Sequence, residues 1–146
     1  MQTRLIREES ALTVLAEVVL SEMSLKASAN VLTLKGDLGA GKTAFTKVLA
    51  RTLGIMEHIT SPTFVIMKSY SVSQHSFIQT LVHIDAYRIE DIDELRVLGF
   101  SELLKDPHTL VCIEWPERVL EMIPEDAYPI GITIEEGESR RISYGN

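Results

Sequence analysis

Apolar residues along the chain follow two spacings, one typical of helices and one of buried strands. From Ser10 to Met23 they recur every three or four positions, which predicts an amphipathic helix with Ser10 as its N-cap. Helical spacing over residues 43–53, followed by Gly54, predicts a second helix that ends at the glycine. Short, mainly apolar runs predict buried strands at residues 31–34, 81–85 and 109–113. Strands and helices that alternate in this order predict an α/β sandwich with a mainly parallel central sheet.

The remaining segments have weaker patterns. Residues 63–70 are expected to be extended, and the acidic residues that begin at Glu90 open a short helix that ends at Gly99. Pro116 suits the first turn of a further helix. Apolar segments on either side of Glu136-Gly137 predict a C-terminal β-hairpin.

Composition restricts the class of protein. The 146 residues fit one domain, expected to span residues 1–146, and 45% of them are hydrophobic. No stretch reaches the roughly 18 apolar residues of a membrane span, and the first residues lack the apolar core of a signal peptide. Cys112 is the only cysteine, which excludes an internal disulfide and favours the reducing cytoplasm. The net charge of −7 argues against a broad basic surface that binds nucleic acid directly.

The most specific motif lies between the first predicted buried strand and the helix over residues 43–53. Residues 36–43 read Gly-Asp-Leu-Gly-Ala-Gly-Lys-Thr, a complete phosphate-binding loop in the strand–loop–helix setting that it requires. Its glycines permit close approach of the backbone, and its amides form a cradle for phosphates with the helix N-terminus. Lys42 is expected to reach the β- and γ-phosphates, and the Thr43 hydroxyl to hold Mg²⁺. The residues expected to bind the nucleotide are Asp37, Leu38, Gly39, Ala40, Gly41, Lys42 and Thr43.

Two acids end the other predicted strands. Asp85 and Glu114 each follow an apolar run, and ligands of parallel sheets bind beyond the carboxyl ends of the strands. Mg²⁺ prefers oxygen ligands, so one acid could hold the metal while the other orients the attacking water. Either acid alone could also be a solvated strand end. The sequence leaves the division of roles open, although the longer Glu114 side chain suits a direct metal contact.

Three further features each allow two interpretations. The segment Thr60-Ser61-Pro62-Thr63 is either an ordinary proline turn or a switch loop that senses the γ-phosphate. Trp115, the only tryptophan, suits the hydrophobic core as well as the site. Arg88 could stabilise phosphate charge or form a surface salt bridge.

Several segments carry a family resemblance. After the phosphate-binding loop come Ser61-Pro62-Thr63-Phe64, His83-Ile84-Asp85-Ala86-Tyr87-Arg88, Glu94-Leu95 with Leu98-Gly99, and Ile113-Glu114-Trp115-Pro116-Glu117. In this order and spacing they resemble the TsaE family (also called YjeE), the bacterial ATPases of threonylcarbamoyladenosine tRNA modification. The resemblance covers about residues 5–135. A phosphate-binding loop is common to many families, but the Glu-Trp-Pro and His-x-Asp-x-Tyr-Arg segments are specific.

The resemblance implies a P-loop NTPase fold and Mg²⁺-dependent ATP hydrolysis that is weak for the protein alone. It also implies action with the TsaB and TsaD proteins; in that family TsaD carries out the threonylcarbamoyl transfer to adenosine 37 of tRNA, so tRNA contact is expected only through the complex. Lys42 would bind phosphate, and Thr43 with Glu114 would hold Mg²⁺. Asp85 and Trp115 match positions important for hydrolysis, and Ser61-Pro62-Thr63 would be a switch-like loop. Contacts to the nucleobase, from the N-terminal segment or from the tail, are left open.

Two other functions compete with this interpretation. A small P-loop kinase that phosphorylates a metabolite would need a second substrate pocket and usually a basic lid, whereas the middle of this chain is acidic and Arg140-Arg141 is its only adjacent basic pair. A nucleotide-binding regulatory module without turnover would not depend on the Glu114 carboxylate.

Overall fold

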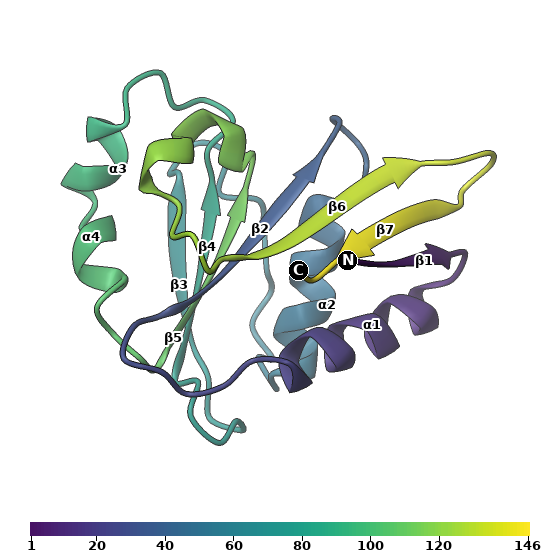
Figure 1. Ribbon diagram of the computed structural model, residues 1–146, viewed down its shortest axis with the longest axis horizontal. Helices are drawn as coiled ribbons and strands as arrows, with labels where there is room; N and C mark the ends of the chain where they lie inside the picture. Colours follow the sequence, from purple (N-terminus) through teal and green to yellow (C-terminus); the bar gives the residue numbers. More distant parts are fainter.

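Seven strands form one sheet in the computed structural model, which describes residues 1–146 (Figure 1). The strands are β1 (Gln2–Ile6), β2 (Asn30–Gly36), β3 (Met67–Ser71), β4 (Thr80–Asp85), β5 (Thr109–Glu114), β6 (Tyr128–Ile134) and β7 (Arg140–Tyr144). Their order across the sheet is β1-β7-β6-β2-β5-β4-β3. The central strands β6, β2, β5 and β4 are parallel to one another. At one edge β3, and at the other β7 and β1, run antiparallel to their neighbours.

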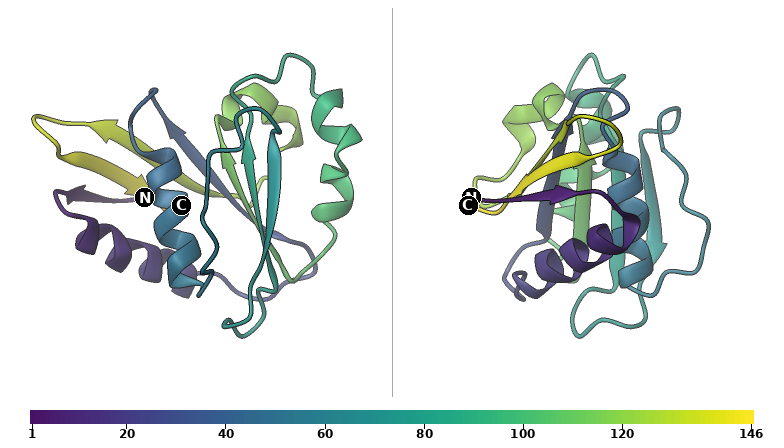
Figure 2. Two further views of the ribbon diagram at one scale, coloured as in Figure 1. Left: turned by 180° about the vertical axis from the view of Figure 1, so that it is seen from behind. Right: turned by 90° about the vertical axis from the view of Figure 1, so that its right-hand side faces the viewer.

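Helices cover both faces of this sheet (Figure 2). One face carries α1 (Glu9–Ser21) and α2 (Lys42–Thr52), and the other carries α3 (Asp93–Val97), α4 (Phe100–Leu103) and the 3₁₀ helix η1 (Pro116–Met122). Alternation along the strands supplies an apolar surface to each layer, because successive side chains point to opposite faces. In β2, Leu32 and Leu34 pack with α1 and α2, whereas Val31 packs with the other layer. None of the helices combines the length and the apolar character that crossing a membrane requires.

The predicted α/β sandwich and its mainly parallel sheet are confirmed, and so is the C-terminal hairpin. β6 and β7 pair antiparallel from Ile130 opposite Tyr144 to Ile134 opposite Arg140. Their connection contains Gly137 at a φ of 67°, a left-handed conformation that glycine adopts without steric cost.

Two parts of the chain differ from the sequence prediction. The pattern gives no sign of β1, because Ile6 is the only buried residue of this edge strand, which pairs with β7. Beside it the two ends of the chain meet, where the Met1 amino group donates to the carbonyl oxygen of Asn146. Residues 63–66 form a turn rather than extended chain, and β3 begins only at Met67.

The predicted helices are present but differ in detail. α1 begins at Glu9 with Glu8 as its N-cap, so the prediction of Ser10 at this position is wrong; Ser10 Oγ donates to the Glu8 carboxylate at 3.3 Å. Gly99 ends α3 as predicted, yet a second short helix, α4, follows it at once. Pro116 does begin a helix, which is of the 3₁₀ type.

The carboxyl ends of three central strands meet at one edge of the sheet. In the register of β2, β5 and β4, Glu114 lies opposite Leu34 on one side and opposite Asp85 on the other. β2 leads directly into the glycine-rich loop, and α2 begins at Lys42. The fold therefore brings the phosphate-binding motif and the two strand-end acids to the same place.

Candidate nucleotide-binding site

The glycine-rich loop is packed tightly against β6. A Cβ atom at Gly36 would lie 2.7 Å from the backbone oxygen of Ile132 and 3.1 Å from the Cβ of Ala40. Gly39 and Gly41 have φ values of 81° and 115°, which side chains rarely tolerate. The loop can thus turn and approach the sheet only because these three positions lack side chains.

Lys42 is folded over the loop. Its Nζ atom donates to the carbonyl oxygens of Gly36 at 2.5 Å and Asp37 at 2.9 Å. The same ammonium lies 4.2 Å from the centre of the Trp115 ring, in the range of a cation–π interaction. Burial lowers the pKa of Lys42, and the negative charge of Glu114 opposes this shift. Several groups thus hold the positive charge at the loop, where a phosphate would bind.

Thr43 and Glu114 lie close enough to act on one ion. The Thr43 hydroxyl is 3.1 Å and 3.0 Å from the two carboxylate oxygens of Glu114. A hydroxyl and a carboxylate are the hard oxygen ligands that Mg²⁺ prefers, so the residues present fit this metal. No group of three or more His, Cys, Asp or Glu residues could hold a metal by itself. This pair fits an ion that completes its shell with phosphate oxygens and water, as Mg²⁺ usually does.

Asp85 contacts the loop at residues 60–63 instead of the phosphate-binding loop. Its Oδ2 atom accepts hydrogen bonds from the hydroxyls of Ser61 at 3.4 Å and Thr63 at 3.2 Å. Its Oδ1 atom accepts one from the backbone amide of Tyr87 at 3.0 Å. The two acids therefore have different partners: Glu114 contacts the Thr43 hydroxyl, and Asp85 holds the 60–63 loop at the end of β4.

Trp115 has an unusual backbone conformation. Its φ of 58° is left-handed, which costs a bulky residue of the order of 1 kcal/mol. The Trp115 amide donates to the carbonyl oxygen of Leu34 at 3.2 Å, and its ring lies 5.0 Å from that of Tyr87. These contacts and the Lys42 ammonium hold the ring over the loop, so Trp115 lines the candidate pocket and also packs against the edge of the core.

One pocket brings most of the predicted residues together. It is lined by Leu38, Gly39, Lys42, Thr43, Ser61, Thr63, Asp85, Tyr87, Arg88, Glu114 and Trp115. Thr60 does not line it, and its hydroxyl accepts a hydrogen bond from Lys68 Nζ at 2.8 Å. Pro62 and Asp37 also lie outside it, whereas Ala40 and Gly41 line a neighbouring pocket. The roles assigned to these residues stay predictions.

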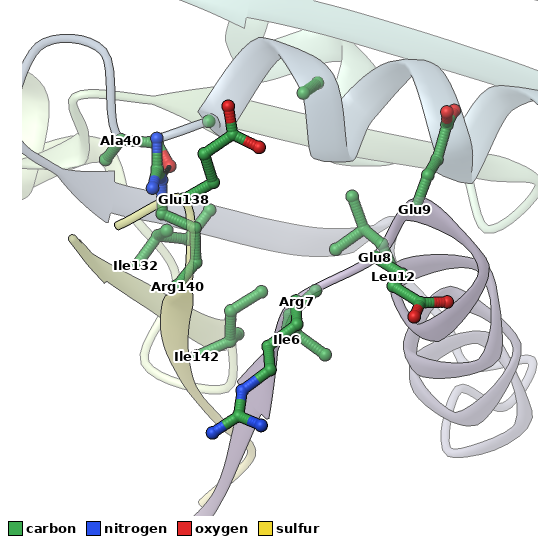
Figure 3. A pocket seen from close by; sticks show the side chains of 12 residues that line it. Ile6, Arg7, Glu8, Glu9, Leu12, Ala40, Ile132, Glu138, Arg140 and Ile142 are labelled. Carbon is green, nitrogen blue, oxygen red and sulfur yellow. Dashed lines mark hydrogen bonds between the residues drawn. The ribbon is translucent and has the colours of Figure 1, made fainter. Parts of the chain in front are cut away.

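That neighbouring pocket lies beside the glycine-rich loop, between the start of α1 and the C-terminal hairpin (Figure 3). Apolar side chains from several elements line it, namely Ile6, Leu12, Ile132 and Ile142. Polar residues complete its lining: Arg7, Glu8, Glu9, Glu138 and Arg140. Arg140 Nε donates to the carbonyl oxygen of Ala40 at 2.9 Å, which ties the hairpin to the loop. Residues of the N-terminal segment and of the C-terminal hairpin thus lie together beside the glycine-rich loop.

Sequence reasoning overlooked two features of the main pocket. His83 Nε2 lies 2.5 Å from Glu114 Oε2, and the alternation of β4 could have indicated that His83 shares a face with Asp85. Arg88 makes no ion pair; its guanidinium carbon lies 4.9 Å from the centre of the Phe64 ring. The expected surface salt bridge of Arg88 is therefore wrong, and no local pattern points to its contact with Phe64.

Comparison with known proteins decides the family. The family model described as threonylcarbamoyl adenosine biosynthesis protein TsaE matches residues 6–142, almost the whole chain. The chain belongs to the TsaE family. The resemblance inferred from the sequence motifs is thereby confirmed.

Individual TsaE proteins are similar over most of this chain. The tRNA threonylcarbamoyladenosine biosynthesis protein TsaE of Borreliella burgdorferi is 40% identical over 96 residues, which are 66% of each chain. That of Bacillus subtilis is 39% identical over 115 residues, 79% of this chain and 68% of the relative. The match thus spans about two thirds of the length of both relatives. The crystal structure of Bacillus subtilis YdiB superposes with a TM-score of 0.71 at 28% identity, covering 98% of this chain and 83% of YdiB.

Proposed function

We propose that this TsaE-family protein binds Mg²⁺ and ATP at the pocket beneath Trp115 and hydrolyses ATP slowly. The observation that carries the proposal is the Thr43–Glu114 pair, whose hydroxyl and carboxylate oxygens lie 3.0–3.1 Å apart beside Lys42. Bound Mg²⁺ would polarise the terminal phosphates and neutralise charge that develops on them. Lys42 would donate to the β- and γ-phosphates in place of its present carbonyl partners.

Asp85 suits the role of orienting the attacking water. It ends β4 next to Glu114, and it holds two hydroxyls of the 60–63 loop within 3.4 Å of one oxygen. A carboxylate that is held by the Tyr87 amide on one oxygen and by the linked Ser61 and Thr63 hydroxyls on the other keeps its lone pairs in defined directions, which a water-positioning group requires. If Ser61 or Thr63 moved when the γ-phosphate is lost, its hydrogen bond to Asp85 would break or shift, and the carboxylate would change position, as expected of a switch loop.

The adenosine half of ATP is proposed to occupy the pocket of Figure 3. Ala40, Gly41 and Ala44 line this pocket and belong to the loop and the first turn of α2, so a nucleotide can extend from one pocket to the other. A lining that combines apolar side chains with polar ones suits a flat, partly polar base. Replacing Leu12 with Asp should weaken ATP binding and leave the binding of inorganic triphosphate unchanged.

In the cell we propose that this activity serves threonylcarbamoyladenosine formation on tRNA, together with TsaB and TsaD in the cytoplasm. The family membership and the names of the relatives support this role. The net charge of −7 is consistent with tRNA contact made by other subunits. A metabolite kinase receives no support, because Arg140 donates to Ala40 and Arg141 to Glu135, which leaves neither arginine as a mobile lid group.

The metal site is tested by titrating Mg²⁺ against ATP hydrolysis in Thr43→Val and Glu114→Gln. Each should lower turnover by at least about 10–100-fold, the loss found even for partners outside the metal's own ligand shell. Two matched controls should behave as the wild type. Thr52→Val removes a hydroxyl at the far end of α2, and Glu121→Gln neutralises an exposed acid on η1. Equal turnover in Glu114→Gln and wild type would refute the site.

The partners are tested separately. Immobilised TsaB–TsaD complex should retain this protein in an ATP-dependent way and should raise its rate of phosphate release. A stoichiometric transfer of phosphate to a small acceptor would instead indicate a kinase. If the complex neither retains the protein nor changes its phosphate release, the proposed pathway role is wrong, whatever the result for the metal site.

A further inference from the structure

His83 is a fully buried histidine in the middle of β4. Its Nε2 atom lies 2.5 Å from Oε2 of Glu114, and the side chains are 0% and 4% exposed. In the register of β4 and β5, His83 lies opposite Cys112, so it reaches Glu114 diagonally, two positions farther along β5. A polar contact this deep persists only when both partners have defined hydrogen-bonding roles.

The surroundings of Glu114 fix those roles. The oxygens of a carboxylate accept hydrogen bonds, and the Thr43 hydroxyl already donates to the same group. His83 must therefore carry its proton on Nε2 and donate. Its other nitrogen, Nδ1, is buried without a partner.

We propose that His83 is a positioning residue for the metal ligand Glu114, an inference that rests on the proposed Mg²⁺ site. By donating to Oε2, the imidazole limits rotation of the carboxylate and keeps it facing the Thr43 hydroxyl. Carboxylates that bind a metal are commonly oriented by hydrogen bonds from residues that do not themselves touch the metal. Loss of such a residue lowers metal affinity about 10–100-fold. A histidine that only filled space in the core would not affect metal affinity in this manner.

Nitrogen NMR of the four histidines tests the hydrogen bond in the protein as it is. His83 should show the Nε2–H form with a slowly exchanging proton, and Glu114→Gln should shift this signal. His75 is an internal reference, because its Nδ1 accepts from the amides of Phe77 and Ile78 and its proton must also lie on Nε2. An Nε2 of His83 that carries no proton would overturn the proposal.

Two variants then test whether the place of the donor, and not only the presence of a polar side chain at residue 83, matters for metal binding. His83→Gln places an amide N–H near the site of Nε2, whereas His83→Asn carries the same group one methylene short of Glu114. Binding of Mn²⁺ in the presence of ADP, measured by electron paramagnetic resonance, should weaken about 10–100-fold in His83→Asn and recover in His83→Gln. Equal affinity in both variants and the wild type would overturn the proposal. Thermal melts confirm folding, and if neither variant folds, the proton assignment in the wild type decides.

The failure of this inference is distinguishable from failure of the metal site itself. Glu114→Gln and Thr43→Val are measured in the same Mn²⁺ titration. If they bind Mn²⁺ as well as the wild type, the proposed metal site is wrong and His83 has no ligand to position. If they lose affinity while His83→Asn does not, the metal site stands and the role of His83 is refuted.

Discussion

Substitution of Gly36 by alanine provides a direct test of how the loop is held. Gly36 is the last residue of β2 and lies opposite Ile132 of β6. The added methyl would lie 2.7 Å from the Ile132 backbone oxygen, a separation that real side chains essentially never show. Because the obstacle is backbone in a paired strand, relief requires β2 and β6 to separate or the glycine-rich loop to move.

The magnitude follows from this steric conflict. Forcing an extra methyl group into a well-packed position costs about 1–3 kcal/mol, and Gly36 adds no left-handed strain to that figure. For a chain of this size, each kcal/mol lowers the melting temperature by about 2–4 °C. The added methyl would also lie 3.1 Å from the Ala40 Cβ, so Ala40 and the glycine-rich loop would have to move as well. Gly36→Ala should therefore lose nucleotide affinity as well as stability.

Gly99→Ala is the matched control. Gly99 has a φ of 85° and open space around its Cα, so alanine there meets left-handed strain of about 1–2 kcal/mol and no clash. Thermal melts and nucleotide titration should show similar losses of stability in the two variants, with weaker binding only in Gly36→Ala. A Gly36→Ala protein within about 0.5 kcal/mol of the wild type and with unchanged nucleotide affinity would refute the reasoning.

Three further outcomes are expected. Asp85→Asn should keep its stability within about 1 kcal/mol, since an amide can still bond to the loop hydroxyls, yet lower hydrolysis about 10²–10⁴-fold; unchanged hydrolysis excludes a water-positioning role. Nucleotide binding should change the fluorescence of Trp115, the only tryptophan, because Lys42 lies 4.2 Å from its ring, and Lys42→Met should remove this response. Burial raises the pKa of Cys112 from 9.0 to about 12, so the folded state holds this proton longer than the unfolded state. The wild type should lose stability relative to Cys112→Ala as the pH rises from 9 towards 12, measured by urea unfolding, and parallel pH profiles would contradict this.

The central part of the fold was predictable because its signals are local. Apolar runs mark β2, β4 and β5, and each run ends at a residue of the site. Parallel strands place their carboxyl ends at one edge, so Asp85 and Glu114 could be expected at the same edge; that they lie directly opposite each other depends on the pairing of β4 with β5. The phosphate-binding loop could be located for the same reason, since its function depends on a strand before it and a helix after it.

The parts that sequence reasoning missed depend on contacts between distant segments. β1 is an edge strand with mostly exposed side chains, and its pairing with β7 involves residues from the two ends of the chain. The turn at residues 63–66 brings the 60–63 loop back to Asp85, about twenty residues later. His83 had a local signal in the alternation of β4, but its hydrogen bond to Glu114 depends on the register with β5.

The side chains proposed to bind the nucleotide and the metal already have partners within the protein. Lys42 donates to two loop carbonyls and faces Trp115, while the Thr43 hydroxyl bonds to Glu114. A phosphate bound by Lys42 would therefore compete with the carbonyl oxygens of Gly36 and Asp37, and a metal at Thr43 would replace a direct hydrogen bond. The net affinity is the difference between the old and new contacts, so it is smaller than the new contacts alone suggest. On the proposed function, a partner that moved Trp115 or the 60–63 loop would change this balance without touching the phosphates.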